Sequence, residues 1–149
     1  MKIVLVVTIG LVGLLAYAGV VVAFESALGF FQPEDESTFV ITTTDEDGVS
    51  TDRVLVRNLS GGRLYAAANH WPRAWYNEAL KNPRVKATVD GITADYIAVP
   101  VDEEEHRQVD AENANGIGLK ILFGFAPRRF LRLDPVERPQ GIDPEIDGV

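Results

Sequence analysis

The sequence contains no cysteine, which excludes disulfides, thiolate nucleophiles and cysteine-ligated metal sites. Histidine is nearly absent as well: His70 and His106 are the only two, and their separation fits no metal-ligand spacing. No serine lies in a nucleophile elbow. The pair Gly116 and Gly118 lacks the third glycine and the preceding strand of a dinucleotide-binding fingerprint. The chain therefore carries none of these common catalytic or metal-binding motifs, and we predict no metal site.

Charge is missing from residues 3–24. A helix of this length, at about 1.5 Å per residue, reaches roughly 33 Å and can cross a hydrocarbon core of about 30 Å. We therefore predict a single transmembrane anchor over residues 1–25. A cleaved secretory signal is the alternative, because residues 16–18 and 21–23 resemble cleavage sites. Lys2 precedes the segment and acidic residues follow it, which favours a domain outside the cytoplasm.

Basic residues are scarce in the rest of the chain, and none occurs between Lys2 and Arg53. Beyond residue 24 there are 13 basic and 22 acidic residues, a net charge of −9. Such a surface repels nucleic-acid phosphates and anionic lipid, so neither is an expected partner of the domain. The length suits one domain with a modest core. We expect a linker over 26–37, the domain over 38–136 and a flexible tail over 137–149.

Short β-branched and apolar runs dominate the domain. They predict strands over residues 38–44, 51–58, 63–68, 84–89, 92–99 and 130–133. Asp90-Gly91 joins two of these runs and indicates a hairpin, and 51–58 with 63–68 suggests another. The expected fold is α+β, mainly β: a small antiparallel β-barrel with two or three helices, preceded by the transmembrane helix.

Two segments interrupt the strand pattern. A short helix is predicted over residues 74–81, because Pro72 suits its first turn and Asn82-Pro83 ends it. A second helix begins at Asp102, which can form a capping box with Glu105. Its polar sequence to residue 115 predicts a solvated element, His106 included. The apolar residues 118–125 are expected to pack on the barrel or on a partner.

Basic side chains concentrate in one predicted strand. Arg53 and Arg57 stand four residues apart, so within one strand they project to the same face. An anion held between them would explain two like charges on one strand face, because guanidinium forks match phosphate geometry. The alternative is that both arginines pair with surface carboxylates, such as those of the Asp45 to Asp47 turn.

A second concentration begins at Asn69, where a predicted strand ends and a helix starts. Free amides and the helix dipole at such a start attract anions. Arg73 adds a full charge, and Asn69 and His70 add directed hydrogen bonds. Flat apolar surface, on which a ring system can stack, comes from Trp71, Trp75 and Tyr76. The alternative reading places the tryptophans in the core and Arg73 in solvent.

Four segments together resemble the flavin-binding split β-barrel superfamily, which includes pyridoxamine phosphate oxidase. They are residues 53–57 (Arg-Val-Leu-Val-Arg), 64–69, 71–73 and 82–85. The resemblance covers residues 39–135 and implies that Arg53, Arg57 and Arg73 bind the cofactor phosphate. Within the superfamily, residues 72–77 followed by Asn-Pro are most similar to the deazaflavin-dependent nitroreductase family. That similarity implies a homodimeric oxidoreductase that transfers hydride to a quinone or nitro-type acceptor, and the predicted anchor over residues 1–25 would tether it to a membrane.

The turn at residues 45–48 (Asp-Glu-Asp-Gly) departs from this family, whose members typically have a basic turn there for the anionic tail of the deazaflavin. Acidic side chains would repel that tail, so the shorter FMN is an equal candidate. The sequence assigns no catalytic residue. Two rival functions stay open: a non-catalytic module that binds flavin, haem or another anionic ligand, and an envelope-facing interaction protein with an empty barrel.

Overall fold

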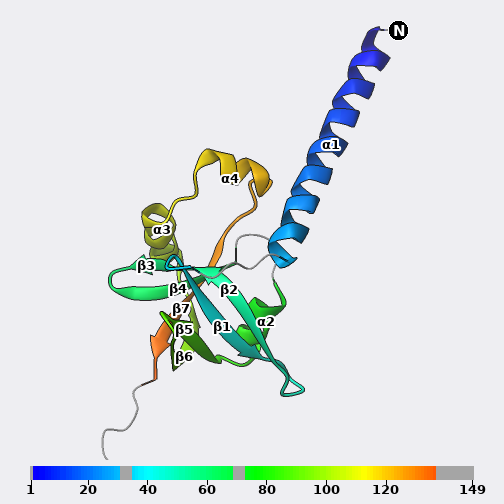
Figure 1. Ribbon diagram of the computed structural model, residues 1–149. Helices are drawn as coiled ribbons and strands as arrows, with labels where there is room; N and C mark the ends of the chain where they lie inside the picture. The colour runs from blue at the N-terminus through cyan, green and yellow to red at the C-terminus, as the bar shows by residue number, and fades with distance from the viewer. Residues whose placement is uncertain (1, 31–34, 69–72, 137–149) are drawn as a thin grey trace, which may run out of the picture.

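The computed structural model describes residues 2–30, 35–68 and 73–136. Helix α1 (Lys2–Phe30) projects away from the rest of the molecule (Figure 1). Its stretch Lys2–Phe24 has a mean hydropathy of 2.5 and is long and apolar enough to cross a membrane, a test that a signal sequence also passes. The helix extends beyond the expected boundary at residue 25, since the Ser26 hydroxyl donates to the Val22 carbonyl and no proline intervenes. The expected tail, 137–149, lies outside the described residues.

Seven antiparallel strands in the described ranges form one sheet, in the order β2-β1-β5-β6-β7-β4-β3. Their bounds are β1 (Thr38–Thr44), β2 (Ser50–Val56), β3 (Asn58–Ser60), β4 (Arg63–Ala68), β5 (Arg84–Val89), β6 (Ile92–Pro100) and β7 (Arg129–Pro135). Most predicted strands are present at nearly the predicted positions. The alternation of β-branched and polar residues, with turns at Gly48, Gly61, Gly62 and Gly91 where φ is positive, sets these limits.

The sheet curls because its two edges are neighbours in the chain. β2 and β3 are the first and last strands of the sheet, yet Arg57 alone separates them. Consecutive Cα atoms lie about 3.8 Å apart, so a single residue can connect the edges only if they meet. β2 also lies against β4. The result is a split antiparallel β-barrel, which confirms the predicted fold class.

Helices cover both faces of this sheet. α2 (Ala74–Lys81) packs on β1 and β6, and α3 (Glu103–Glu112) packs on the opposite face beside β3. β4 serves both cores, because its side chains alternate: Ala66 and Ala68 face the α2 core, whereas Tyr65 and Ala67 face the α3 core. The α2 core consists of Phe39, Ile41, Ala66, Ala68, Trp75, Tyr76, Ala79, Val85, Ala87, Ala98, Leu131 and Leu133.

The prediction that α3 is a solvated element holds for most of the helix but is wrong for Val109 and His106. Val109 is fully buried in the α3 core, and the His106 ring lies 5.2 Å from that of Phe130. His106 Nε2 also hydrogen-bonds to the Arg128 carbonyl at 2.9 Å. The polar sequence hides this contact, because one apolar side chain and several polar ones attach the helix to the sheet.

The capping box that opens α3 is only half formed. Asp102 Oδ1 accepts hydrogen bonds from the amides of Glu104 and Glu105, as expected for the N-cap. The Glu105 carboxylate does not turn back; it accepts two hydrogen bonds from Arg132, at 2.9 and 3.0 Å. Glu105 therefore pairs with the charged Arg132 of β7 and not with the backbone amide, since hydrogen bonds between ionised groups are the stronger ones.

The second predicted hairpin is also wrong in part. β2 pairs along its whole length with β1, from Thr38 opposite Val56 to Thr44 opposite Ser50. Only the short β3 forms a hairpin with β4. The strand expected over residues 51–58 breaks at Arg57, where the Asn58 side chain donates to the Val56 carbonyl and occupies a group that a continuing strand would use.

Candidate functional site

Arg53 lies on β2 opposite Ile41 of β1. Opposite residues of an antiparallel pair project from the same side of the sheet, and Ile41 is fully buried in the α2 core. Arg53 therefore projects from the face that α2 covers, and it is half-buried. Among the residues that the structure describes, its guanidinium has no hydrogen-bond or ion-pair partner.

Arg57 occupies the seam of the barrel, between β2 and β3. Its guanidinium donates to the two Asp90 carboxylate oxygens at 2.7 and 3.2 Å, and to the Thr38 carbonyl at 3.3 Å. The hydrogen bond from Arg57 holds the pKa of Asp90 below its ordinary value. This contact ties the seam to the β5–β6 turn, and only Nε of the guanidinium is buried without a partner.

The arrangement of Arg57 corrects the premise that both arginines share a strand face. β2 ends at Val56, so the two-residue alternation does not reach Arg57. Arg57 has instead the carboxylate pairing that we considered as the alternative, although its partner is Asp90 and not the turn at 45–47. Nothing in the sequence signals Asp90 as that partner, because the contact joins residues 33 positions apart.

Helix α2 begins without a side-chain cap from its own N-cap residue. Arg73 is its N-cap residue, with extended backbone (φ −69°, ψ 152°) and no side-chain hydrogen bond to the first turn. Of the predicted binding residues near this point, Asn69, His70 and Trp71 lie outside the described residues. Trp75 and Tyr76 are only 4% and 7% exposed and belong to the α2 core, where their rings meet edge to face at 5.8 Å.

Arg53 and α2 lie on the same side of the sheet. The Thr43 hydroxyl donates to Glu78 Oε2 of α2 at 2.7 Å. Thr43 is two residues from Ile41 on β1 and thus shares its face, the face from which Arg53 projects. The structure therefore brings Arg53 and the helix that follows Arg73 to one side of the sheet, and leaves Arg57 at the seam.

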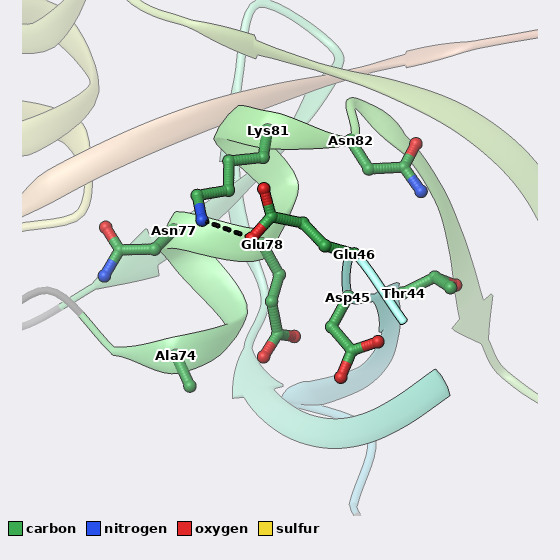
Figure 2. Close-up of a pocket in the computed structure, with 8 residues that line it drawn as sticks. All are labelled: Thr44, Asp45, Glu46, Ala74, Asn77, Glu78, Lys81 and Asn82. Carbon is green, nitrogen blue, oxygen red and sulfur yellow. Dashed lines mark hydrogen bonds and ion pairs between the residues drawn. The ribbon is translucent and has the colours of Figure 1, made fainter. Parts of the chain in front are cut away.

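A pocket of about 310 Å³ lies between the β1–β2 turn and α2 (Figure 2). Its lining residues are Thr44, Asp45, Glu46, Ala74, Asn77, Glu78, Lys81 and Asn82. Three of these are carboxylates, and the one cation, Lys81, already pairs with Glu46 at 2.8 Å. Asp45 Oδ1 accepts from the amides of Asp47 and Val49, which orders the turn. The pocket is thus rigid on one side and negative.

A second pocket, of about 620 Å³, lies on the other face of β1 and β5. Its charged lining residues are mixed in sign: Asp52, Arg84, Lys86 and Asp95. None of Arg53, Arg57 and Arg73 lines either of these two pockets. The three predicted phosphate-binding arginines are therefore not gathered around either pocket, and their ligand role remains a prediction.

The α3 face contains a charged network that the sequence did not suggest. Arg132 lies between Glu105 and Asp134, with N to O distances of 2.8–3.0 Å. The Tyr65 hydroxyl donates to Glu105 at 2.8 Å. Burial, and then this hydrogen bond, raise the pKa of Tyr65, and the hydrogen bond from Arg132 lowers the pKa of Asp134. These groups satisfy one another and stabilise the attachment of α3.

No protein family and no curated protein matches this sequence. Solved structures do match its fold. An F420-H2 dependent reductase (FDR-A) superposes with a TM-score of 0.57 at 16% identity, covering 70% of this chain and 99% of the reductase. HutZ, the heme storage protein from Vibrio cholerae, gives 0.56 at 19% identity, with 70% and 84% covered. A domain-swapped dimer gives 0.57 at 16% identity, with 68% and 82% covered. These matches show that the chain shares their fold.

Proposed function

We propose that this chain is a membrane-tethered oxidoreductase that binds a flavin or deazaflavin and transfers hydride to a quinone or nitro-type acceptor. The fold that it shares with an F420-H2 dependent reductase supports the cofactor class. α1, if retained, holds the domain at a bilayer, within reach of lipid-soluble acceptors. The similarity to a domain-swapped dimer supports a homodimer. Lys2 before the span and the acidic residues after it favour a domain outside the cytoplasm.

The observation that carries the proposal is the Arg53 guanidinium, which has no hydrogen-bond or ion-pair partner among the described residues. The chain has 22 acidic residues against 14 basic ones, so carboxylates are plentiful. A half-buried arginine without an anionic partner in the described structure is therefore unexpected, because partial burial removes water that would solvate the charge. A phosphate group fits the guanidinium fork and would supply the missing partner.

The start of α2 supports the same position for an anion. Arg73 stands at the N-cap, and its side chain makes no capping hydrogen bond to the first-turn amides. A helix N-terminus offers both hydrogen-bond donors and the positive end of the helix dipole to a phosphate. α2 covers the face from which Arg53 projects, so Arg53 and Arg73 are the two cations that we assign to the cofactor phosphate. Asn69, His70 and Trp71 remain proposed contributors.

Charge bears on which cofactor fits. The pocket beside the β1–β2 turn has three carboxylates, Asp45, Glu46 and Glu78, against Lys81. A cofactor whose negative charge is confined to one phosphate, such as FMN, avoids that turn. The long anionic tail of a deazaflavin would have to run in another direction. When bound, either cofactor supplies the hydride chemistry, and the chain's own residues bind and orient it.

A non-catalytic binding module on the same fold is the second candidate. The similarity to HutZ, a heme storage protein, favours it. His106 is a poor haem ligand, because its Nε2 is hydrogen-bonded to Arg128 and its ring packs on Phe130. The absorption spectrum of the full chain in detergent separates the candidates. Reduction of a copurified flavin by an electron donor and its reoxidation by a quinone would favour the enzyme.

The arginine assignment is tested by titrating FMN and F420 into the full chain in detergent. Arg53→Ala and Arg73→Ala should each weaken cofactor binding by about 1–3 kcal/mol, since each removes a charged hydrogen-bond donor from the phosphate. Arg107→Ala is the matched control, because Arg107 is exposed on α3, on the opposite side of the sheet. If all three variants bind like the parent, both arginines are surface residues and the phosphate site is elsewhere.

A further inference from the structure

Between α3 and β7 the chain leaves the barrel and packs against α1 (Figure 1). This excursion contains the short helix α4 (Ile117–Leu122), and we call residues 117–125 the apolar arch. Tyr17 of α1 donates its hydroxyl to the Ile121 carbonyl at 2.7 Å, and the rings of Phe24 and Phe123 lie 5.6 Å apart. A Cβ placed on Gly124 would meet Val21 at 3.4 Å.

The apolar arch exposes large hydrophobic side chains. Their exposed fractions are 69% for Ile117, 43% for Leu119, 45% for Ile121 and 64% for Phe125. Lys120 is the only charged residue in the arch. Four large apolar side chains exposed within nine residues are unusual on a water-exposed surface and indicate a segment that another apolar surface covers.

The contacts with α1 indicate what covers the arch. Tyr17, Val21 and Phe24 belong to the last turns of the stretch Lys2–Phe24, which is apolar enough to span a bilayer. Phe24 stands seven positions after Tyr17 in the helix, a rise of about 10 Å at 1.5 Å per residue. When α1 spans a membrane, the arch therefore lies at the depth of the last ~10 Å of the span, where lipid surrounds α1.

The backbone of the arch suits this environment. Lipid offers no hydrogen bonds, so polar backbone groups within it must be satisfied by the protein. After α4 the amides of Phe123, Gly124 and Phe125 donate to the carbonyls of Leu119, Ile121 and Lys120. Tyr17 supplies a further donor to the Ile121 carbonyl from the neighbouring helix. Many backbone groups of the arch thus form hydrogen bonds within the protein.

We propose that the apolar arch is an interfacial membrane element that lies beside α1 at the domain-proximal boundary of the bilayer. Ile117, Leu119, Ile121 and Phe125 contact lipid, and the Lys120 ammonium reaches the headgroups on its apolar stem. The inference rests on the retained α1 tether of the proposed function, and it does not depend on the cofactor.

The base of the arch is fixed to the barrel, so this contact would also orient the barrel. Arg128, at the start of β7, donates to Asp110, to the Asn113 carbonyl and to Asn58 at 2.7–3.1 Å. The chain then meets the membrane at two points, α1 and the arch. Two attachments restrict rotation of the barrel about the axis of α1, which one flexible tether would permit.

The absence of cysteine makes a direct test simple. Ile117→Cys and Ile121→Cys variants of the full chain carry a nitroxide spin label in vesicles of phosphatidylcholine and phosphatidylglycerol. Power saturation compares collisions with oxygen, which concentrates in lipid, and with a water-soluble nickel chelate. Ile92→Cys is the matched control, because Ile92 is an isoleucine that is 73% exposed at the start of β6. We expect oxygen to dominate at 117 and 121, and the nickel chelate to dominate at 92.

Two outcomes would overturn the proposal. Nickel collisions at 117 and 121 equal to those at 92 would place the arch in water. Strong spin–spin broadening, with both reagents excluded, would show that a second copy of the chain covers the arch. Cofactor titration of the same samples separates this result from the proposed function. An arch in lipid without flavin binding supports the membrane proposal and contradicts the cofactor assignment. An arch in water with flavin binding contradicts the membrane proposal and supports the cofactor assignment.

Discussion

The arginines on the two faces of the sheet differ in their hydrogen-bond and ion-pair partners. On the α3 face, Arg128 and Arg132 each have carboxylate partners at 2.8–3.1 Å. On the α2 face, Arg53 has no partner in the described structure, and the start of α2 has no side-chain cap. Polar groups that satisfy one another stabilise a fold, whereas unsatisfied ones suit a ligand. The comparison therefore indicates that the polar groups of the α3 face stabilise the fold, and it supports the proposal that the α2 face binds a ligand.

Arg57 belongs to neither face. Its contacts show why hydrogen-bond partners, and not residue type, distinguish an arginine that stabilises the fold from one that could bind a ligand. Its guanidinium connects the seam to Asp90 and to the start of β1. A role in closing the barrel accounts for these contacts without a ligand. The remaining Nε is buried and has no partner among the described residues.

The largest expected effect on stability comes from Arg128→Ala. Arg128 is largely buried, over the ring of Phe130, and donates to Asp110, Asn58 and the Asn113 carbonyl. Its loss leaves the buried Asn58 oxygen without that donor and should lower the free energy of unfolding by about 2–4 kcal/mol. Urea denaturation of the full chain in detergent, followed by the fluorescence of its two tryptophans, Trp71 and the buried Trp75, measures the change.

Arg53→Ala is the control on the opposite face, and its free energy of unfolding should change by less than about 0.5 kcal/mol, because no described contact is lost. Arg128→Lys should recover part of the loss, since it keeps the charge beside Asp110 but not the planar fork. Equal effects of Arg128→Ala and Arg53→Ala would abolish the distinction between the faces.

The local elements of this fold were predictable from sequence because their signals are local. The β-branched run at 38–44, the Asp90-Gly91 turn and the Asn82-Pro83 helix stop act within a few residues. The seam at Arg57 was not predictable, since it depends on two edges of a seven-stranded sheet meeting. The same limit applies to Glu105, whose choice of Arg132 over its own helix start depends on strand β7.

The candidate site was predictable only in part, for the same reason. The sequence indicated Arg53, and the register of β2 against β1 agrees with its projection toward the α2 core. The spacing of Arg57 suggested a shared face, but spacing cannot reveal where a strand ends. Trp75 and Tyr76 are aromatic residues at helical spacing that serve the core, a use which composition alone does not distinguish from ring stacking.

Asp134→Asn should have a smaller effect on the free energy of unfolding, and this effect should depend on pH. Asp134 accepts two hydrogen bonds from Arg132, which hold its pKa below the ordinary value of 3.8. A carboxyl with a depressed folded-state pKa contributes stability above its unfolded pKa and loses it as the pH falls through the folded value. The parent should therefore be more stable than Asp134→Asn at neutral pH, and the two should converge as the pH falls through the lowered folded-state pKa of Asp134.

Thermal unfolding of both proteins across the acid range checks this sign. Asp95→Asn serves as the control, because the exposed Asp95 side chain has no ion pair among the described residues. It should track the parent more closely at neutral pH than Asp134→Asn does. A stability difference for Asp134→Asn that persists unchanged at low pH would mean that packing, and not the charge on Asp134, causes the effect.

The smallest effect on stability should come from Lys81→Ala, which is nonetheless informative about the α2 face. Lys81 and Glu46 pair at 2.8 Å, but both side chains are well exposed, at 60% and 75%, so the free energy of unfolding should change by less than about 0.5 kcal/mol. Removing this cation leaves the pocket with three carboxylates. F420, with its anionic tail, should then bind more weakly, whereas FMN should bind as before. If Lys81→Ala weakens the binding of F420 and FMN equally, the cofactor phosphate lies in this pocket and not beside Arg53.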